Sequence, residues 1–230
     1  MQTILPGVHF ITGLLAGRVY LIEDPDGLTL IDASVPPAVG PILNQIRALG
    51  RTPRDVKRIL ITHAHPDHVG DLPRLQRETG AQIVASALEQ PVIEGRAPIS
   101  RAPADSRRGP FKLRMPLTMF KPTPVDLALQ GGEILPVLGG LRALLTPGHA
   151  PGHLSFWQPE KRLLFCGDVL FNAPNLRLPP GFLTVDMDED RRSVRKLVDL
   201  APAVVCFGHG RPLTEQAADV LRAFARRIGV

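Results

Sequence analysis

Short runs of apolar residues, separated by turn residues, open the chain and predict β-strands. The expected strands cover residues 8–12, 19–23 and 28–33, and the turn at residues 24–27 (DPDG) joins the last two. From Val39 to Leu49, apolar residues recur at the three- and four-residue spacing of a helix, and a glycine follows as a stop signal. Strand therefore gives way to helix early in the chain.

The same alternation continues beyond this helix. Residues 56–62 predict a β-branched strand, residues 69–79 a helix closed by Gly80, and residues 81–86 the next strand. The second half predicts strands at residues 125–129, 141–146, 154–158, 162–166 and 203–207, and helices at residues 189–200 and 215–228. This alternation is typical of an α/β domain, and we expect residues 1–230 to form a single one.

One segment, residues 95–124, breaks the pattern, because prolines punctuate it and its basic and apolar residues show no period. An insertion of this length in a compact domain is more often a functional loop than a linker, so we expect a lid that sets substrate choice. Burial in a homodimer interface is the alternative. The apolar residues that either role would use are Ile99, Phe111, Leu113, Met115, Leu117, Met119 and Phe120.

The chain has seven histidines, and six of them directly follow apolar, strand-like runs. Loops at one edge of an α/β fold converge in space, so these side chains can share a site. The strongest local pattern is residues 62–68 (THAHPDH). Residues two apart in extended backbone face the same side, so His63 and His65 can bind one ion together. The proline that follows turns the chain and brings Asp67 and His68 toward a second position.

Three further candidate ligands also lie where predicted strands end, each beside a glycine: His149 in residues 146–153 (TPGHAPGH), Asp168 and His209. Imidazole nitrogens and carboxylate oxygens together suit zinc, while iron and manganese are also admissible. His153, in the same loop as His149, is expected to brace that loop or to support a metal ligand rather than to bind metal itself.

The order of these elements resembles that of the metallo-β-lactamase fold superfamily over nearly the whole chain. The matching residues include Asp32 in residues 30–33 (LIDA), which looks like the aspartate of that superfamily's first motif. The resemblance implies an αββα sandwich, in which two mixed β-sheets pack face to face and helices cover both outer sides.

The resemblance also implies how the ligands divide between two metal ions, for which we expect zinc. His63, His65 and His149 would hold one ion, Asp67, His68 and His209 the other, and Asp168 would bridge them. The implied enzyme is a dinuclear hydrolase in which a hydroxide shared by the metals attacks an ester, thioester or lactone-type bond of a small molecule. Asp67 would orient the attacking water. Asp32 either fixes the tautomer of a ligand histidine or caps a strand end.

Several branches of the superfamily stay open. Exported β-lactamases are disfavoured because they lack the aspartate that resembles Asp168. Glyoxalase II enzymes add a helical tail that grips glutathione, and this sequence gives no clear support for that activity. Quorum-quenching lactonases place a tyrosine near the bridging aspartate. The one tyrosine of this chain is Tyr20, which disfavours a lactonase. The alternatives are a mononuclear iron enzyme like the persulfide dioxygenases, a phosphodiesterase or ribonuclease, and a non-catalytic metal-binding module.

Composition adds expectations about location and partners. The net charge of +5 comes from 27 basic and 22 acidic residues, but the arginines are scattered, so nucleic acid is not an expected partner. Cys166 and Cys206 lie in apolar runs and are expected to be buried, reduced thiols. The N-terminus shows no signal-peptide pattern and no apolar run is long enough to span a bilayer, so we expect a cytoplasmic protein without a membrane partner.

Overall fold

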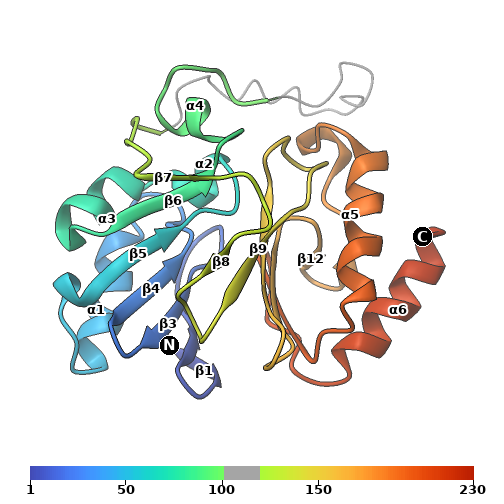
Figure 1. The fold of residues 1–230 in the computed structure, drawn as a ribbon, viewed down its shortest axis with the longest axis horizontal. Coiled ribbons are helices and arrows are strands. Elements are labelled where there is room, and N and C mark those ends of the chain that lie inside the picture. Colours follow the sequence, from blue (N-terminus) through green and yellow to red (C-terminus); the bar gives the residue numbers. More distant parts are fainter. Residues whose placement is uncertain (101–119) are drawn as a thin grey trace.

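A computed structural model describes residues 1–100 and 120–230 and shows two β-sheets packed face to face with helices on both outer sides (Figure 1). This is the predicted αββα sandwich, which is confirmed. The first sheet has seven strands in chain order: β1 (Gln2–Leu5), β2 (Val8–Phe10), β3 (Tyr20–Asp24), β4 (Gly27–Ile31), β5 (Val56–Leu60), β6 (Gln82–Ser86) and β7 (Leu127–Leu129).

The second sheet has five strands, in the order β14 (Val204–Phe207), β11 (Leu163–Gly167), β10 (Leu154–Gln158), β9 (Leu141–Leu145) and β8 (Ile134–Leu135). Strand β11 pairs with β14 in parallel and with β10 in antiparallel fashion, so the sheet is mixed. A two-stranded ribbon of β12 (Phe171–Asn172) and β13 (Leu176–Arg177) follows β11 in the chain.

The helices form the outer layers of the sandwich. The helices α1 (Val39–Ala48) and α3 (Leu72–Thr79) lie outside the first sheet, whereas α5 (Met187–Asp199) and α6 (Ala217–Ile228) lie outside the second (Figure 1). Two short helices, α2 (Pro66–Val69) and α4 (Gln90–Ile93), occur in loops that follow strands of the first sheet, and the 3-10 turns are η1 (Pro53–Asp55) and η3 (Gly181–Leu183).

Side-chain alternation along the strands separates three apolar layers. In β11, Leu163 and Phe165 pack between the sheets, whereas Leu164 and Cys166 pack under α5 and α6. Both cysteines of the chain are buried and unpaired, as expected. A strand with both faces buried is apolar at most positions, which explains the continuous apolar run of β11 in the sequence.

The helix predicted for residues 69–79 is instead two helices, α2 and α3, because the chain turns between them. Asp71 sits at this break, where its carboxylate accepts a hydrogen bond from the backbone N–H of Val39 at the start of α1, 3.1 Å away. Pro73, in the first turn of α3, lacks the N–H that a continuous helix would use. The sequence pattern does not predict strands β1, β8, β12 and β13 or helix α4, since each is short and has no clear period.

The predicted insertion at residues 95–124 lies mostly outside the described residues, which omit 101–119. At its described ends, Ile99 and Phe120 pack against the apolar layer between the first sheet and its helices. Its role as a lid or as a dimer interface stays a prediction. Among the residues that the structure describes, no helix is both long and apolar enough to cross a lipid bilayer.

The layer between the sheets is expected to carry much of the stability. Phe156 on β10 is fully buried in that layer, so Phe156→Ala should lower the free energy of unfolding by about 3–5 kcal/mol through lost apolar contact and a cavity. Ile134, which is 64% exposed on the edge strand β8 of the same sheet, offers a control, since Ile134→Ala should cost less than about 0.5 kcal/mol. Denaturant unfolding measures both. Equal losses would contradict this assignment of the core.

Candidate metal centre

The predicted ligands meet at the edge where the two sheets adjoin. Loops after β5 of the first sheet and after β9, β11 and β14 of the second sheet reach this edge. In the second sheet, β10 runs antiparallel to both β9 and β11, and β14 runs parallel to β11, so β9, β11 and β14 all end on the same side. The loops carry all seven predicted residues: His63, His65, Asp67, His68, His149, Asp168 and His209.

One group of three imidazoles spans both sheets. His63 and His65 follow β5, His149 follows β9, and one ring nitrogen from each lies within 4.8 Å of the others. The Nε2 atom of His149 is 2.9 Å from Nδ1 of His65. All three side chains are buried, so they form a compact nitrogen cluster of the kind that binds a borderline cation.

A second group consists of Asp67, His68 and His209, whose ligand atoms also lie within 4.8 Å of one another. The Nε2 atom of His209 is 3.0 Å from Oδ2 of Asp67, and Nε2 of His68 is 3.8 Å from the same oxygen. The side chains of Asp67 and His209 are 27% and 24% exposed, so this group faces solvent while the first is enclosed.

The carboxylate of Asp168 lies between the two groups. Its Oδ2 atom is 3.4 Å from Nε2 of His149 and 3.3 Å from Nε2 of His209, and its Oδ1 atom is 3.4 Å from Nε2 of His68. The side chain is only 3% exposed. A single carboxylate therefore contacts members of both groups, as a residue that bridges two cations must.

Three buried polar atoms at the centre have no hydrogen-bond partner among residues 1–100 and 120–230: Nε2 of His63, Nε2 of His68 and Oδ1 of Asp168. A buried polar group without a partner costs roughly 1–3 kcal/mol, so native proteins rarely leave several together. Nitrogen and carboxylate atoms that converge without partners are the donor set of a metal site. The residues present therefore fit the divalent metals implied by the motif.

The first group presents uncharged rings. Burial lowers the pKa of His65 to about 4, and burial together with the neighbouring histidines holds the pKa values of His63 and His149 well below the ordinary range. At neutral pH these imidazoles are therefore neutral, and each keeps a lone pair that can bind metal.

In the second group, the carboxylates together have the largest effect on the pKa of His209. Burial lowers the pKa of His209, but the charge of Asp168 and hydrogen bonds to Asp168 and Asp67 outweigh this effect and raise the pKa to about 9. Burial alone would raise the pKa of Asp67, but His68 and His209 together have the larger effect and lower this pKa to about 2. This half of the site thus attracts positive charge.

Asp32 supports the second group from behind. Its Oδ2 atom accepts a hydrogen bond from Nδ1 of His68 at 2.7 Å, while the backbone and hydroxyl of Thr62 donate to the two carboxylate oxygens at 2.8 Å. Because Nδ1 donates, Nε2 of His68 is left as the ligand atom. Of the two predicted roles for Asp32, the structure favours orientation of a ligand histidine over a strand-end cap.

His153 braces Asp168, in line with its expected bracing role. Its Nε2 atom accepts a hydrogen bond from the backbone N–H of Asp168 at 3.0 Å, so the ring proton sits on Nδ1. Nδ1 lies 2.9 Å from the hydroxyl of Thr146, to which it donates. The ring is fully buried and belongs to neither group of candidate ligands.

Two contacts of the site have no sequence signal. The hydroxyl of Thr184, far along the chain, lies 3.3 Å from Nδ1 of His149, and the ring of Phe171 packs 4.3 Å from that of His209. A further buried carboxylate, Glu89, contacts two of the ligand loops. No motif surrounds these residues, so only the folded structure could identify them.

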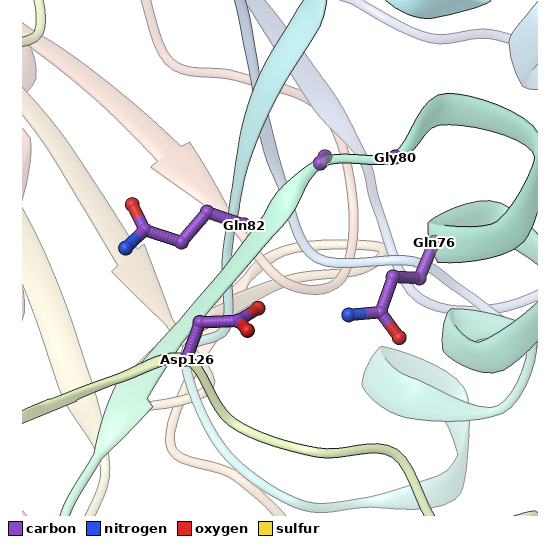
Figure 2. Close-up of a pocket in the computed structure, with 5 residues that line it drawn as sticks. Gln76, Gly80, Gln82 and Asp126 are labelled. Carbon is purple, nitrogen blue, oxygen red and sulfur yellow. The ribbon is translucent and has the colours of Figure 1, made fainter.

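A polar groove elsewhere on the molecule is separate from this centre. It is lined by Gln76, Gly80, Gln82 and Asp126, near the start of β6 and ahead of β7 (Figure 2). Because β6 runs parallel to β5, this groove lies at the opposite end of the first sheet from His63. Asp126 already accepts a hydrogen bond from the backbone N–H of Ile83 at 2.7 Å, which gives it a structural role.

Comparison with known proteins establishes the family. The family model described as "Metallo-beta-lactamase superfamily" matches residues 12–209. The chain belongs to this superfamily. The resemblance seen in the motifs is thereby confirmed, and the match includes all seven candidate ligands.

Relatives within the metallo-β-lactamase superfamily carry hydrolase names. The "Probable metallo-hydrolase YflN" of Bacillus subtilis is 30% identical over 90% of this chain and 85% of its own length. A "Hydroxyacylglutathione hydrolase" of Methylococcus capsulatus is 33% identical over 66% of this chain but 47% of its own length. Similarity to the second relative therefore concerns about half of that protein.

Solved structures of superfamily members share the fold. A metallo-beta-lactamase family protein from Thermus thermophilus superposes with a TM-score of 0.76 at 24% identity, covering 99% of this chain and 81% of the other. A subclass B3 metallo-beta-lactamase of Bradyrhizobium japonicum superposes with a TM-score of 0.69 at 26% identity, covering 99% and 91%.

The support from Asp32 makes a testable prediction. Asp32→Asn keeps the shape of the side chain but removes its charge, so the ring of His68 should lose its fixed tautomer. We expect the affinity of the second group for zinc to fall by about 10- to 100-fold, while the first group is unaffected. Zinc titration followed by imidazole nitrogen NMR shifts measures this. Unchanged shifts and affinity at His68 would contradict the role of Asp32.

Proposed function

We propose that this protein is a dinuclear, metal-dependent hydrolase. In this proposal His63, His65 and His149 hold one divalent ion, Asp67, His68 and His209 hold the second, and Asp168 binds both. The observation that carries the proposal is the position of Asp168, whose carboxylate lies within 3.4 Å of ring nitrogens from both groups.

Two divalent ions held in this way supply a strong nucleophile from water at neutral pH and polarise the bond under attack. The protein's own contribution is to place and shield the reacting groups. The first group is enclosed, whereas Asp67 and His209 reach solvent, so we propose that the substrate approaches from their side. Asp67 is then placed to accept a hydrogen bond from the attacking water and to orient it.

The proposed substrates are small molecules with an ester, thioester or lactone-type bond. The name of one relative, a hydroxyacylglutathione hydrolase, supports this class, whereas the name of the other, a probable metallo-hydrolase, supports hydrolysis in general. Because the similarity covers 47% of the length of the hydroxyacylglutathione hydrolase, it supports acyl-bond hydrolysis and not recognition of glutathione. The buried, unpaired cysteines are in keeping with the cytoplasmic location that we propose, where thiols stay reduced.

Zinc is the proposed metal, because four-coordinate sites rich in imidazole suit it best. Iron and manganese accept the same donors. A mononuclear iron enzyme of the persulfide dioxygenase kind would use a subset of these ligands, and bound-metal analysis separates it from the hydrolase: about two zinc ions per chain support the proposal, and one iron contradicts it.

The bridging role of Asp168 predicts distinct outcomes for two variants. Asp168→Ala should impair both metal positions and abolish hydrolysis of an ester, thioester and lactone panel, because one carboxylate serves two ions. Asp67→Asn should lose the second metal and keep the first. Metal content and turnover of the purified, folded variants test this. Two metals and normal turnover in Asp168→Ala would refute the bridge.

The pKa shifts predict that the two metals differ in their dependence on pH. The ring of His209, with a pKa of about 9, must release a proton when metal binds at pH 7, whereas His65, with a pKa of about 4, has none to release. Below pH 9 the affinity of the second group should therefore fall by about tenfold or more per pH unit, while that of the first group changes little down to about pH 5.

Isothermal titration calorimetry in two buffers of different ionisation enthalpy measures the protons released in each binding step. We expect at least one proton for one step and close to none for the other. The same proton count for both steps would be inconsistent with the partition of the ligands.

A further inference from the structure

A buried carboxylate outside the candidate ligand set joins two of the ligand loops. Glu89 is only 5% exposed, and each of its oxygens accepts one backbone hydrogen bond. Oε2 accepts from the N–H of Ala64 at 3.0 Å, and Oε1 accepts from the N–H of Gly152 at 2.8 Å. Ala64 stands between His63 and His65, and Gly152 belongs to the loop of His149.

The two hydrogen-bond donors belong to different sheets. Ala64 follows β5 of the first sheet, whereas Gly152 precedes β10 of the second, so the carboxylate spans the junction between the two halves of the sandwich. A backbone hydrogen bond from Leu154 to Thr62, at 2.8 Å, joins the same two loops nearby. Glu89 thus acts at the place where the first histidine group is assembled from both sheets.

We propose that Glu89 is a positioning residue that holds the loop of His63 and His65 at the correct distance from the loop of His149. This inference rests on the proposed function, because it concerns the first metal position. The effect is indirect, since the carboxylate of Glu89 accepts its hydrogen bonds from backbone N–H groups and not from a candidate ligand atom.

The chemistry of the contact requires a carboxylate. An ionised carboxylate is an acceptor at both oxygens and therefore matches two N–H donors, whereas an amide would turn its own N–H groups toward one of them. Hydrogen bonds from backbone N–H groups to a charged acceptor are also stronger than neutral ones. Burial raises the pKa of Glu89, and the two N–H donors oppose that shift.

The packing around the carboxylate leaves little room for another arrangement. A Cβ atom at Gly152 would lie 2.7 Å from Cβ of Leu88 and 2.9 Å from Cγ of Glu89, so this approach requires glycine. The loop of His149 consequently fits tightly against the chain that leads into α4.

A role for Glu89 in helix capping does not explain its side chain. Glu89 is the residue before α4, but its side chain makes no capping hydrogen bond to that helix. The backbone carbonyl of Glu89 accepts hydrogen bonds from the N–H groups of Val92 and Ile93, so the backbone of this residue, and not its side chain, caps the start of the helix. The carboxylate is directed to the ligand loops instead.

The inference predicts an effect that is selective for one metal. Glu89 makes no hydrogen bond to Asp67, His68 or His209, and His68 is held separately by Asp32. Loss of the Glu89 contacts should therefore weaken the first metal position and spare the second. A general loss of stability would weaken both.

The test compares Glu89→Gln with Glu94→Gln in the full chain. Glu94 follows the same short helix and its carboxylate accepts hydrogen bonds from Gln90, Arg96 and the N–H of Val125, with none from a ligand loop, so it is a matched control. Zinc is titrated into each metal-free protein. The imidazole nitrogen shifts of His65 and His149 report the first position, and those of His68 and His209 report the second.

We expect Glu89→Gln to lower the zinc affinity of the first position by about 10- to 100-fold, with the second position and all of Glu94→Gln close to wild type. Wild-type affinity at both positions in Glu89→Gln, or equal losses at both, would overturn the inference. A wild-type protein that binds fewer than two metals would instead overturn the proposed function.

A second variant covers the case in which Glu89→Gln does not fold. Glu89→Asp keeps the charge but is one methylene shorter, so it can reach only one of the two N–H groups. Glu89→Asp should lower the zinc affinity of the first position by a smaller factor than Glu89→Gln does. If Glu89→Asp binds zinc at that position as tightly as wild type, the two-loop contact is not needed and the inference fails.

Discussion

The burial of one carboxylate, that of Asp168, is the constraint on which the rest of the site depends. A charged group in a protein interior is unfavourable unless opposite charge or hydrogen-bond donors surround it, so the loops around Asp168 must deliver such groups. The backbone approaches these side chains so closely that two nearby positions cannot carry a Cβ atom. A Cβ atom at Gly208 would lie on Oδ1 of Asp168, and one at Gly167 would lie 2.5 Å from Nε2 of His153, so both positions require glycine.

The same constraint explains why the site is built from both sheets. Asp168 directly follows β11 of the second sheet, and the imidazoles that face it come from loops of both sheets, so their positions depend on how the two halves of the sandwich meet. Two other carboxylates, which belong to neither group of candidate ligands, hold those ligands in position. Asp32 fixes the ring of His68, and we propose that Glu89 sets the spacing between the loops of the first histidine group.

Much of this could be predicted from the sequence, because strand ends and their glycines are local signals. The seven candidate ligands all follow predicted strands, and the structure brings all of them together. The contacts of Glu89 and Thr184 could not be predicted, since each joins segments far apart in the chain with no motif. The break between α2 and α3 depends partly on the distant partner that Asp71 finds in α1, which no local pattern shows, and partly on Pro73, which the helix predicted for residues 69–79 does not take into account.

The most direct test of the proposed dinuclear centre is a crystal structure of the zinc-loaded protein with anomalous scattering measured at the zinc absorption edge. We expect two peaks, one bound by His63, His65 and His149 and one bound by Asp67, His68 and His209, with a carboxylate oxygen of Asp168 within bonding distance of each. A single peak, or two peaks of which Asp168 touches only one, would contradict this expectation.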